Sequence, residues 1–168
     1  MLVISMPLAE QHNFRIAHLV DTPAALSTLI RWFIDEWEPW YGPDGGGDAE
    51  SDLADCSSRD ALPICLVALG AEAEVFGSVA LRTESVGDDL GVGPWLAGFL
   101  VGRAYRGQGV GRGLAEAIKG EARRLGFESI FTSVEPAVGA RLARRGWEPF
   151  GSAESLRSEV TVYRRQLA

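Results

Sequence analysis

The sequence is poor in the residues that build disulfide frameworks, metal centres and nucleic-acid surfaces. It has two cysteines and two histidines, and 16 basic against 23 acidic residues leave a net charge of −7. Cys56 and Cys65 form no CxxC motif and have no histidine nearby, so we expect two reduced thiols and neither a disulfide framework nor a zinc site. The acidic balance disfavours a general nucleic-acid binder.

Long apolar runs are also missing. The longest, at residues 64–71 and 95–101, fall far short of the roughly 18 residues that cross a membrane. Residues 1–7 have no basic region before their brief apolar run, which is unlike a secretory signal. With 168 residues, 46% apolar and 23% charged, the composition predicts one domain spanning residues 1–168, soluble, cytoplasmic and without a membrane partner.

Charge is distributed unevenly along the chain. Residues 1–100 carry 16 acidic and 4 basic side chains, whereas residues 101–168 carry 7 acidic and 12 basic ones. This polarity suits a protein whose first part attracts a cation while its second part holds an anion. Solvated surface charge without any function gives the same pattern and stays open as an alternative.

Hydrophobic periodicity predicts a mixed α/β domain. A helix is expected from about Leu26 to Trp37, after a cap and proline at Asp21-Thr22-Pro23. A longer amphipathic helix is expected over 110–125, ended by Gly126. Strands are expected at residues 14–19, 64–69, 75–81, 95–101, 130–134 and 160–167, with a short helix at 137–145.

The order of these elements predicts the pairing of the strands. Residues 64–69 and 75–81 form an antiparallel hairpin, whereas strand 95–101, the following helix and strand 130–134 form a right-handed crossover with parallel strands. A mixed sheet follows. The acidic, glycine-rich segment 42–60 is expected to be a mobile loop containing a short helix, and both a lid and a disordered surface excursion are open interpretations.

The segment between strand 95–101 and the long helix is the most informative one. Four glycines alternate there over seven positions, at residues 107, 109, 111 and 113. A helix N-terminus offers unpaired N–H groups and a positive dipole end, and glycine lets a phosphate approach them. Arg106 and Arg112 bracket the loop. We therefore expect a site for a phosphate-bearing ligand, because a tight turn alone needs fewer glycines.

Two common phosphate motifs do not fit this loop. The pattern GxxxxGK[ST] is absent, and the sole lysine, Lys119, lies inside the following helix. The dinucleotide pattern GxGxxG fails because its third glycine falls on Arg112 or Leu114 in either register. Only Glu135, after the next strand, keeps the dinucleotide alternative open.

The pattern that fits is RxxGxG at Arg106, Gly109 and Gly111, followed downstream by Gly146-Trp147. With these motifs the chain resembles the GNAT superfamily of N-acetyltransferases over most of its length. The resemblance implies a central mixed β-sheet flanked by helices, with a splayed pair of parallel strands. It implies acetyl-CoA as cosubstrate, no metal, and a primary amine as acceptor.

The resemblance also assigns the cofactor site. The loop would hold the diphosphate of acetyl-CoA, with Arg106 at its head, and Leu100 and Val101 would contact the pantetheine. A backbone N–H near Val101 would stabilise the oxyanion that develops on the thioester. The expected loop residues are Arg106, Gly107, Gln108, Gly109, Val110, Gly111, Arg112 and Gly113.

Acid–base groups are less obvious. Attack by an amine requires removal of a proton, yet strand 95–101 contains no Asp, Glu or His. The nearest carboxylates in the sequence are Glu84, Asp88 and Asp89 after the third strand and Glu36 near the end of the first helix, and Glu84 and Glu36 are the candidates we prefer. The family often has a tyrosine four residues before its Gly-aromatic pair, where this chain has Leu142. Either Ser133 or Tyr163 protonates the leaving thiolate instead, or CoA leaves as a thiolate without help, since it is already a good leaving group; these alternatives stay open.

Aromatic and acidic residues around the end of the first helix suggest the acceptor. Trp40 and Tyr41 lie beyond the core face of that helix, close to Glu36 in the sequence, and such groups suit an ammonium ligand. We expect a small cationic amine. A non-catalytic acetyl-CoA-binding or sensing protein, and a protein or peptide N-acetyltransferase, are the alternatives, and a homodimer stays open.

Overall fold

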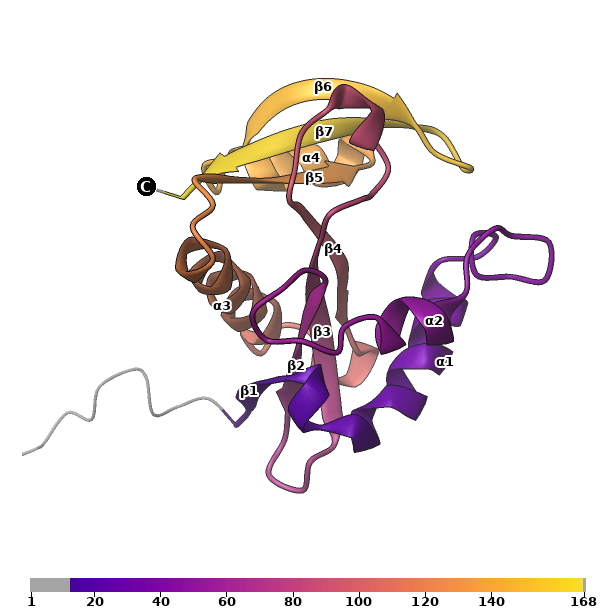
Figure 1. The fold of residues 1–168 in the computed structure, drawn as a ribbon, viewed down its shortest axis with the longest axis vertical. Coiled ribbons are helices and arrows are strands. Elements are labelled where there is room, and N and C mark those ends of the chain that lie inside the picture. Colours follow the sequence, from indigo (N-terminus) through magenta and orange to yellow (C-terminus); the bar gives the residue numbers. More distant parts are fainter. Residues whose placement is uncertain (1–12, 168) are drawn as a thin grey trace, which may run out of the picture.

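A computed structural model describes residues 13–167 (Figure 1). The expectation about a secretory signal concerns residues 1–7 and lies outside the described residues. The strands are β1 (Arg15–His18), β2 (Ile64–Leu69), β3 (Val75–Arg82), β4 (Trp95–Val101), β5 (Ser129–Val134), β6 (Glu148–Glu154) and β7 (Glu159–Gln166). The α-helices are α1 (Leu26–Glu36), α2 (Ala49–Ala54), α3 (Val110–Arg124) and α4 (Pro136–Ala143).

The strands form one mixed sheet in the order β1-β2-β3-β4-β5-β7-β6. Strands β4 and β5 are parallel, and the other neighbouring strands are antiparallel. The predicted hairpin and the predicted parallel crossover are both confirmed. In Figure 1, α3 lies on one side of the central strands and α1 and α2 lie on the other. The helix that carries the glycine-rich loop is thus separated by the sheet from α1.

Strand β6 is not among the predicted strands. It contains Pro149 and Gly151, which strands disfavour, and most of its side chains are exposed. It is an edge strand that pairs with β7, and its register shifts between Pro149 and Gly151. Pairing with β7 therefore defines this strand, because its own sequence has no strand periodicity.

The start of α1 differs from the prediction. Residues Pro23–Ala25 form a 3-10 turn, α1 begins at Leu26, and no side chain caps either element. The Thr22 hydroxyl donates to a carbonyl at the end of β1, at 3.4 Å, and Asp21 pairs with Arg59. The predicted side-chain cap is wrong because both candidate side chains have other partners.

Helix α3 ends as predicted. Gly126 has a φ of +91°. Its N–H donates to the carbonyl of Arg123 at 3.0 Å, and the N–H of Phe127 donates to the carbonyl of Ala122, also at 3.0 Å. Together these bonds form a Schellman motif, which satisfies carbonyl groups that the end of a helix otherwise leaves unpaired.

The acidic segment 42–60 contains the short helix that the sequence predicts. Asp48 caps α2 by accepting from the N–H of Ser51 at 3.1 Å. Leu53 and Cys56 are buried in the same cluster as the apolar face of α1. The part of the segment from α2 to Cys56 is therefore packed against the fold, and whether the segment acts as a lid stays a prediction.

Both cysteines are free and buried, as expected. Cys56 follows α2 and Cys65 lies on β2. The interaction between the two thiols lowers the pKa of Cys56, and the same interaction together with burial raises the pKa of Cys65. Within residues 13–167, no group of three or more His, Cys, Asp or Glu side chains is arranged to hold a metal ion.

The core has a separate cluster on each side of the sheet. Val110, Leu114, Ile118 and Ala122 of α3 are at most 1% exposed and pack on one face, which confirms the predicted buried side of this helix. Helices α1 and α2 pack on the other face. None of the helices in the described part of the chain is long and apolar enough to cross a membrane.

A β-bulge interrupts β4 at Gly98 and Phe99. The register of β3 and β4 shifts between Ser78 and Ala80, and Gly98 adopts a left-handed φ of +56°. The Ser78 hydroxyl donates to the carbonyl of Gly98 at 2.9 Å. On the α1 side, a Cβ at Gly98 would lie 3.1 Å from the ring of Phe33. The bulge is therefore held by β3 and covered by α1.

We expect Gly98→Ala to lower the free energy of unfolding by about 2–4 kcal/mol, measured by urea denaturation. The added methyl group meets the left-handed strain of the backbone and the ring of Phe33. Gly91→Ala is the matched control, because Gly91 also has a positive φ, +73°, but no atom lies within 4 Å of its Cβ position. That variant should lose only about 1–2 kcal/mol. Equal losses would show that the Phe33 ring makes room.

Candidate active site

The glycine-rich loop presents a row of unpaired amides at the start of α3. Gly107 and Gly109 have φ of +75° and +85°, which turn the chain sharply into the helix. The first N–H that bonds within the helix is that of Gly113, to the carbonyl of Gly109 at 3.0 Å. Among the described residues, the amides of 107–112 have no backbone acceptor. We call these amides the anion cradle, because they converge at a positive helix end.

Side chains of the loop stabilise its conformation. The Nε of Arg106 donates to the carbonyl of Val101 at 3.0 Å, and the Nε2 of Gln108 donates to that of Ala104 at 3.1 Å. Arg112 is exposed. Arg106 is thus turned toward β4 in this structure, and Arg112 is the freer of the two arginines to reach a phosphate.

The remaining glycines of the loop differ in what they face. A Cβ at Gly111 would lie 3.6 Å from the side chains of Phe99 and Val101, so this glycine borders β4. A Cβ at Gly113 would lie 3.0 Å from the ring of Phe14. Since the Gly113 amide is already used within the helix, the structure places this residue in packing against the β1 end of the chain rather than in the anion cradle.

Beside the cradle, β4 and β5 diverge. Their register contains one bridge, between Trp95 and Phe131, and the hydroxyl of Thr132 donates to the carbonyl of Leu96 at 3.1 Å. Beyond that point the strands separate. We call the stretch between residues 97–101 and 133–134, where the two strands form no bridge, the notch.

Val101 directs its peptide groups into the notch. The N–H of the next residue, Gly102, donates to β3, to the carbonyl of Phe76 at 2.9 Å. Because successive peptide groups of a strand point to opposite sides, the N–H and carbonyl of Val101 face β5. The carbonyl of Val101 accepts a hydrogen bond from Arg106, so the N–H of Val101 is the group left facing the notch. The side chain of Leu100 is buried under α1.

A model of the acetyltransferase (GNAT) family matches residues 26–146. The chain belongs to this family. Its mixed sheet, flanking helices and splayed parallel pair are the fold that the sequence motifs predicted.

Solved structures of GNAT proteins share this fold. An acetyltransferase of the GNAT family from Staphylococcus aureus is 14% identical, with a TM-score of 0.68, over 92% of this chain and 99% of that chain. The yncA protein of Salmonella typhimurium, determined with its cofactor acetyl-CoA, is 21% identical, with a TM-score of 0.68, over 94% and 95%. An aminoglycoside 6'-N-acetyltransferase complexed with coenzyme A is 11% identical, with a TM-score of 0.71, over 92% and 97%. No curated protein sequence matches the chain.

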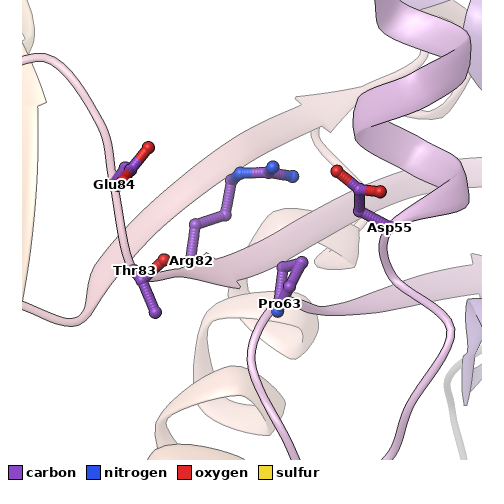
Figure 2. A pocket seen from close by; sticks show the side chains of 5 residues that line it. All are labelled: Asp55, Pro63, Arg82, Thr83 and Glu84. Atoms are coloured by element: carbon purple, nitrogen blue, oxygen red, sulfur yellow. The ribbon is translucent and has the colours of Figure 1, made fainter.

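The three predicted acid–base residues of this GNAT domain lie in different places. Glu36 is exposed in the last turn of α1, three residues after Phe33, which contacts the bulge. Glu84 is also exposed, two residues beyond the end of β3, at the opposite end of that strand from the notch. It lines a pocket of about 350 Å³ with Asp55 and Arg82. Figure 2 shows Arg82 reaching between the two carboxylates.

Ser133 is half-buried on β5, where this strand borders the notch. It pairs with Val162 on β7, while its neighbour Thr132 pairs with Tyr163. Tyr163 is 9% exposed, and a Cβ at Gly139 of α4 would lie 2.3 Å from its hydroxyl. The Tyr163 hydroxyl therefore rests on the backbone of α4, the helix in which the family tyrosine would stand.

The aromatic residues near α1 are mostly packed. Phe33 and Trp37 make an edge-to-face contact at 4.8 Å, and Tyr41 stacks on Phe33 at 6.2 Å. The Tyr41 hydroxyl donates to Asp52 at 2.7 Å, and burial, followed by this bond, raises the pKa of Tyr41 above its usual value. The predicted position of Tyr41 beyond the core is therefore wrong. Trp40, by contrast, is 45% exposed.

We expect Gly109→Ala to weaken acetyl-CoA binding at least tenfold, measured by calorimetry. The methyl group opposes a φ of +85° and would displace the amides of the cradle. Gly120→Ala on α3 is the control, because its Cβ position has no atom within 4 Å. It should leave the Kd unchanged and stabilise the helix by about 0.5–1 kcal/mol. Unchanged binding by Gly109→Ala would contradict the assignment of the cradle.

Proposed function

We propose that the protein is an acetyl-CoA-dependent N-acetyltransferase, and that a small cationic amine attacks the acetyl group directly in a ternary complex. The observation that carries the proposal is the anion cradle beside the open notch. The cradle suits a diphosphate, and the notch offers backbone groups to an extended chain that carries amides. Acetyl-CoA contains both features, so the residues present fit this cosubstrate.

The geometry supports a stepwise description of the transfer. The acetyl carbonyl would lie in the notch, where the N–H of Val101 donates to the oxygen as negative charge develops on it. The amine nitrogen attacks the carbonyl carbon, the C–S bond breaks, and the thiolate of CoA leaves. The amine loses a proton to a base and the thiolate gains one, which is the role proposed for Ser133, on the β5 side of the notch.

Glu36 and Glu84 are the proposed groups for taking up the proton or binding the acceptor. Glu36 is favoured by position, since its helix covers the bulge through Phe33. The acidic residues in the first part of the chain also favour a cationic acceptor, because their field raises the local concentration of cations.

Glu36→Gln should raise the KM for a cationic acceptor about twofold to fivefold, because an exposed carboxylate attracts a cation by no more than about 1 kcal/mol. Glu84→Gln removes the same charge at the far end of β3 and should change kcat/KM by less than about twofold. Steady-state kinetics across pH distinguish the two roles. A greater loss in Glu84→Gln, with the acidic limb of the pH profile altered, would reverse the assignment, because a base loses activity when it is protonated.

The proposed function is tested by incubating the protein with acetyl-CoA and a panel of polyamines, aminoglycosides, amino acids and short peptides, with product mass as the readout. Acetylation of cationic small amines is the expected result. Acetyl-CoA binding is measured separately by calorimetry. Binding without transfer to any acceptor would favour a non-catalytic acetyl-CoA-binding protein, and transfer to peptides alone would favour a protein or peptide acetyltransferase.

A further inference from the structure

The turn between β6 and β7 is organised to present one arginine. The hydroxyl of Ser155 donates to the carbonyl of Ser158 at 2.8 Å. The hydroxyl oxygen of Ser155 also accepts hydrogen bonds from the N–H groups of Arg157 and Ser158, at 3.2 and 3.1 Å. A backbone bond from Ser155 to Ser158, at 2.9 Å, closes the turn. The backbone at Arg157 is therefore well defined although the turn is exposed.

Arg157 reaches across to the end of α1. Its Nε donates to the carbonyl of Glu38 at 2.7 Å, and its Nη2 donates to the carbonyl of Glu36 at 3.0 Å and also to that of Glu38. In Figure 1, the β6–β7 turn and the segment after α1 lie on the same side of the molecule. Carbonyls at a helix C-terminus lack intrahelical donors and carry partial negative charge, so this end of α1 binds a guanidinium.

The two residues whose carbonyls bind Arg157 also carry carboxylates, and Arg157 does not bond to either carboxylate. Glu36 and Glu38 are both exposed, and within residues 13–167 neither carboxylate forms an ion pair. Trp40, two residues further, is 45% exposed. Two carbonyls, two free carboxylates and an exposed indole are the groups that hold organic cations. Arg157 uses the carbonyls alone and leaves negative charge uncompensated.

This place lies about one helical turn beyond the contact between α1 and the bulge. Phe33 contacts the bulge at Gly98, and Glu36 follows three residues later, a rise of about 4.5 Å along the helix. A ligand whose amine lies at the notch can thus extend a second group to the end of α1 over a short aliphatic chain.

We propose that the end of α1 is a binding subsite for the second cationic group of the acceptor, and that Arg157 fills this subsite in the free protein as an internal competitor. The inference rests on the proposed function and adds to it the acceptor class, an aliphatic amine with a guanidinium or a second ammonium at its far end. Such an acceptor displaces Arg157, after which its cation meets the carbonyls of Glu36 and Glu38 together with their carboxylates.

The test compares Arg157→Gln with the wild-type protein, using agmatine, which carries a guanidinium at its far end, and n-butylamine, which has a single charge. Removing the internal competitor raises the fraction of protein that is free to bind. The KM for agmatine should fall about threefold to tenfold, whereas the KM for n-butylamine and both kcat values should change less than twofold. Arg15→Gln is the charge-matched control, since Arg15 is exposed on β1 at the opposite edge of the sheet, and it should change neither KM.

Equal changes in KM for both amines, or a higher KM for agmatine, would overturn the inference and leave Arg157 as a structural link. If no variant acetylates any amine, the proposed function fails, and agmatine binding is then measured by calorimetry. Tighter binding to Arg157→Gln than to the wild type would still support the subsite, and equal binding would refute it. Thermal unfolding checks the fold of each variant. Arg157→Lys, which cannot bridge both carbonyls in the same way, should give intermediate values.

Discussion

The divergence of β4 from β5 is the constraint on which the site depends. One bridge, Trp95 to Phe131, holds the two parallel strands together, and a parallel pair that stops there leaves peptide groups of β4 without partners. Buried unpaired backbone groups are costly, so an opening of this kind persists where solvent or a ligand satisfies them. The bulge at Gly98 and the bond from Thr132 to Leu96 stabilise the divergence from both strands.

The two sides of the sheet divide the chemistry between them. Helix α3 places the anion cradle on one side, while α1 covers the bulge from the other. The charges follow the same division along the chain, with acidic residues predominating before residue 100 and basic residues after it. In the proposed function, a phosphate-rich cosubstrate and a cationic acceptor would therefore approach the notch from opposite faces without competing for the same charges.

Contacts between the acidic and basic parts also tie the chain together. Arg124 pairs with Asp60 at 2.7 Å, and Arg157 binds the end of α1. Both contacts are exposed, so water competes for the same groups, and an exposed ion pair such as that of Arg124 with Asp60 contributes only about 0–1 kcal/mol to stability. Their weakness matters for function, because a side chain that stabilises the fold only slightly can be displaced by a ligand at little cost.

The sequence by itself determined the elements with strong local signals. The periodicity of α3, its glycine stop at Gly126 and the RxxGxG motif depend on neighbours a few residues apart, and these predicted the anion cradle and the family. Tertiary structure alone decided the features that depend on distant residues. Strand β6 exists through β7, Tyr41 is packed through Phe33 and Asp52, and Arg157 meets carbonyls that lie about 120 residues earlier in the chain. A backbone carbonyl has no signature in the sequence, so its partner becomes visible only once the chain is folded.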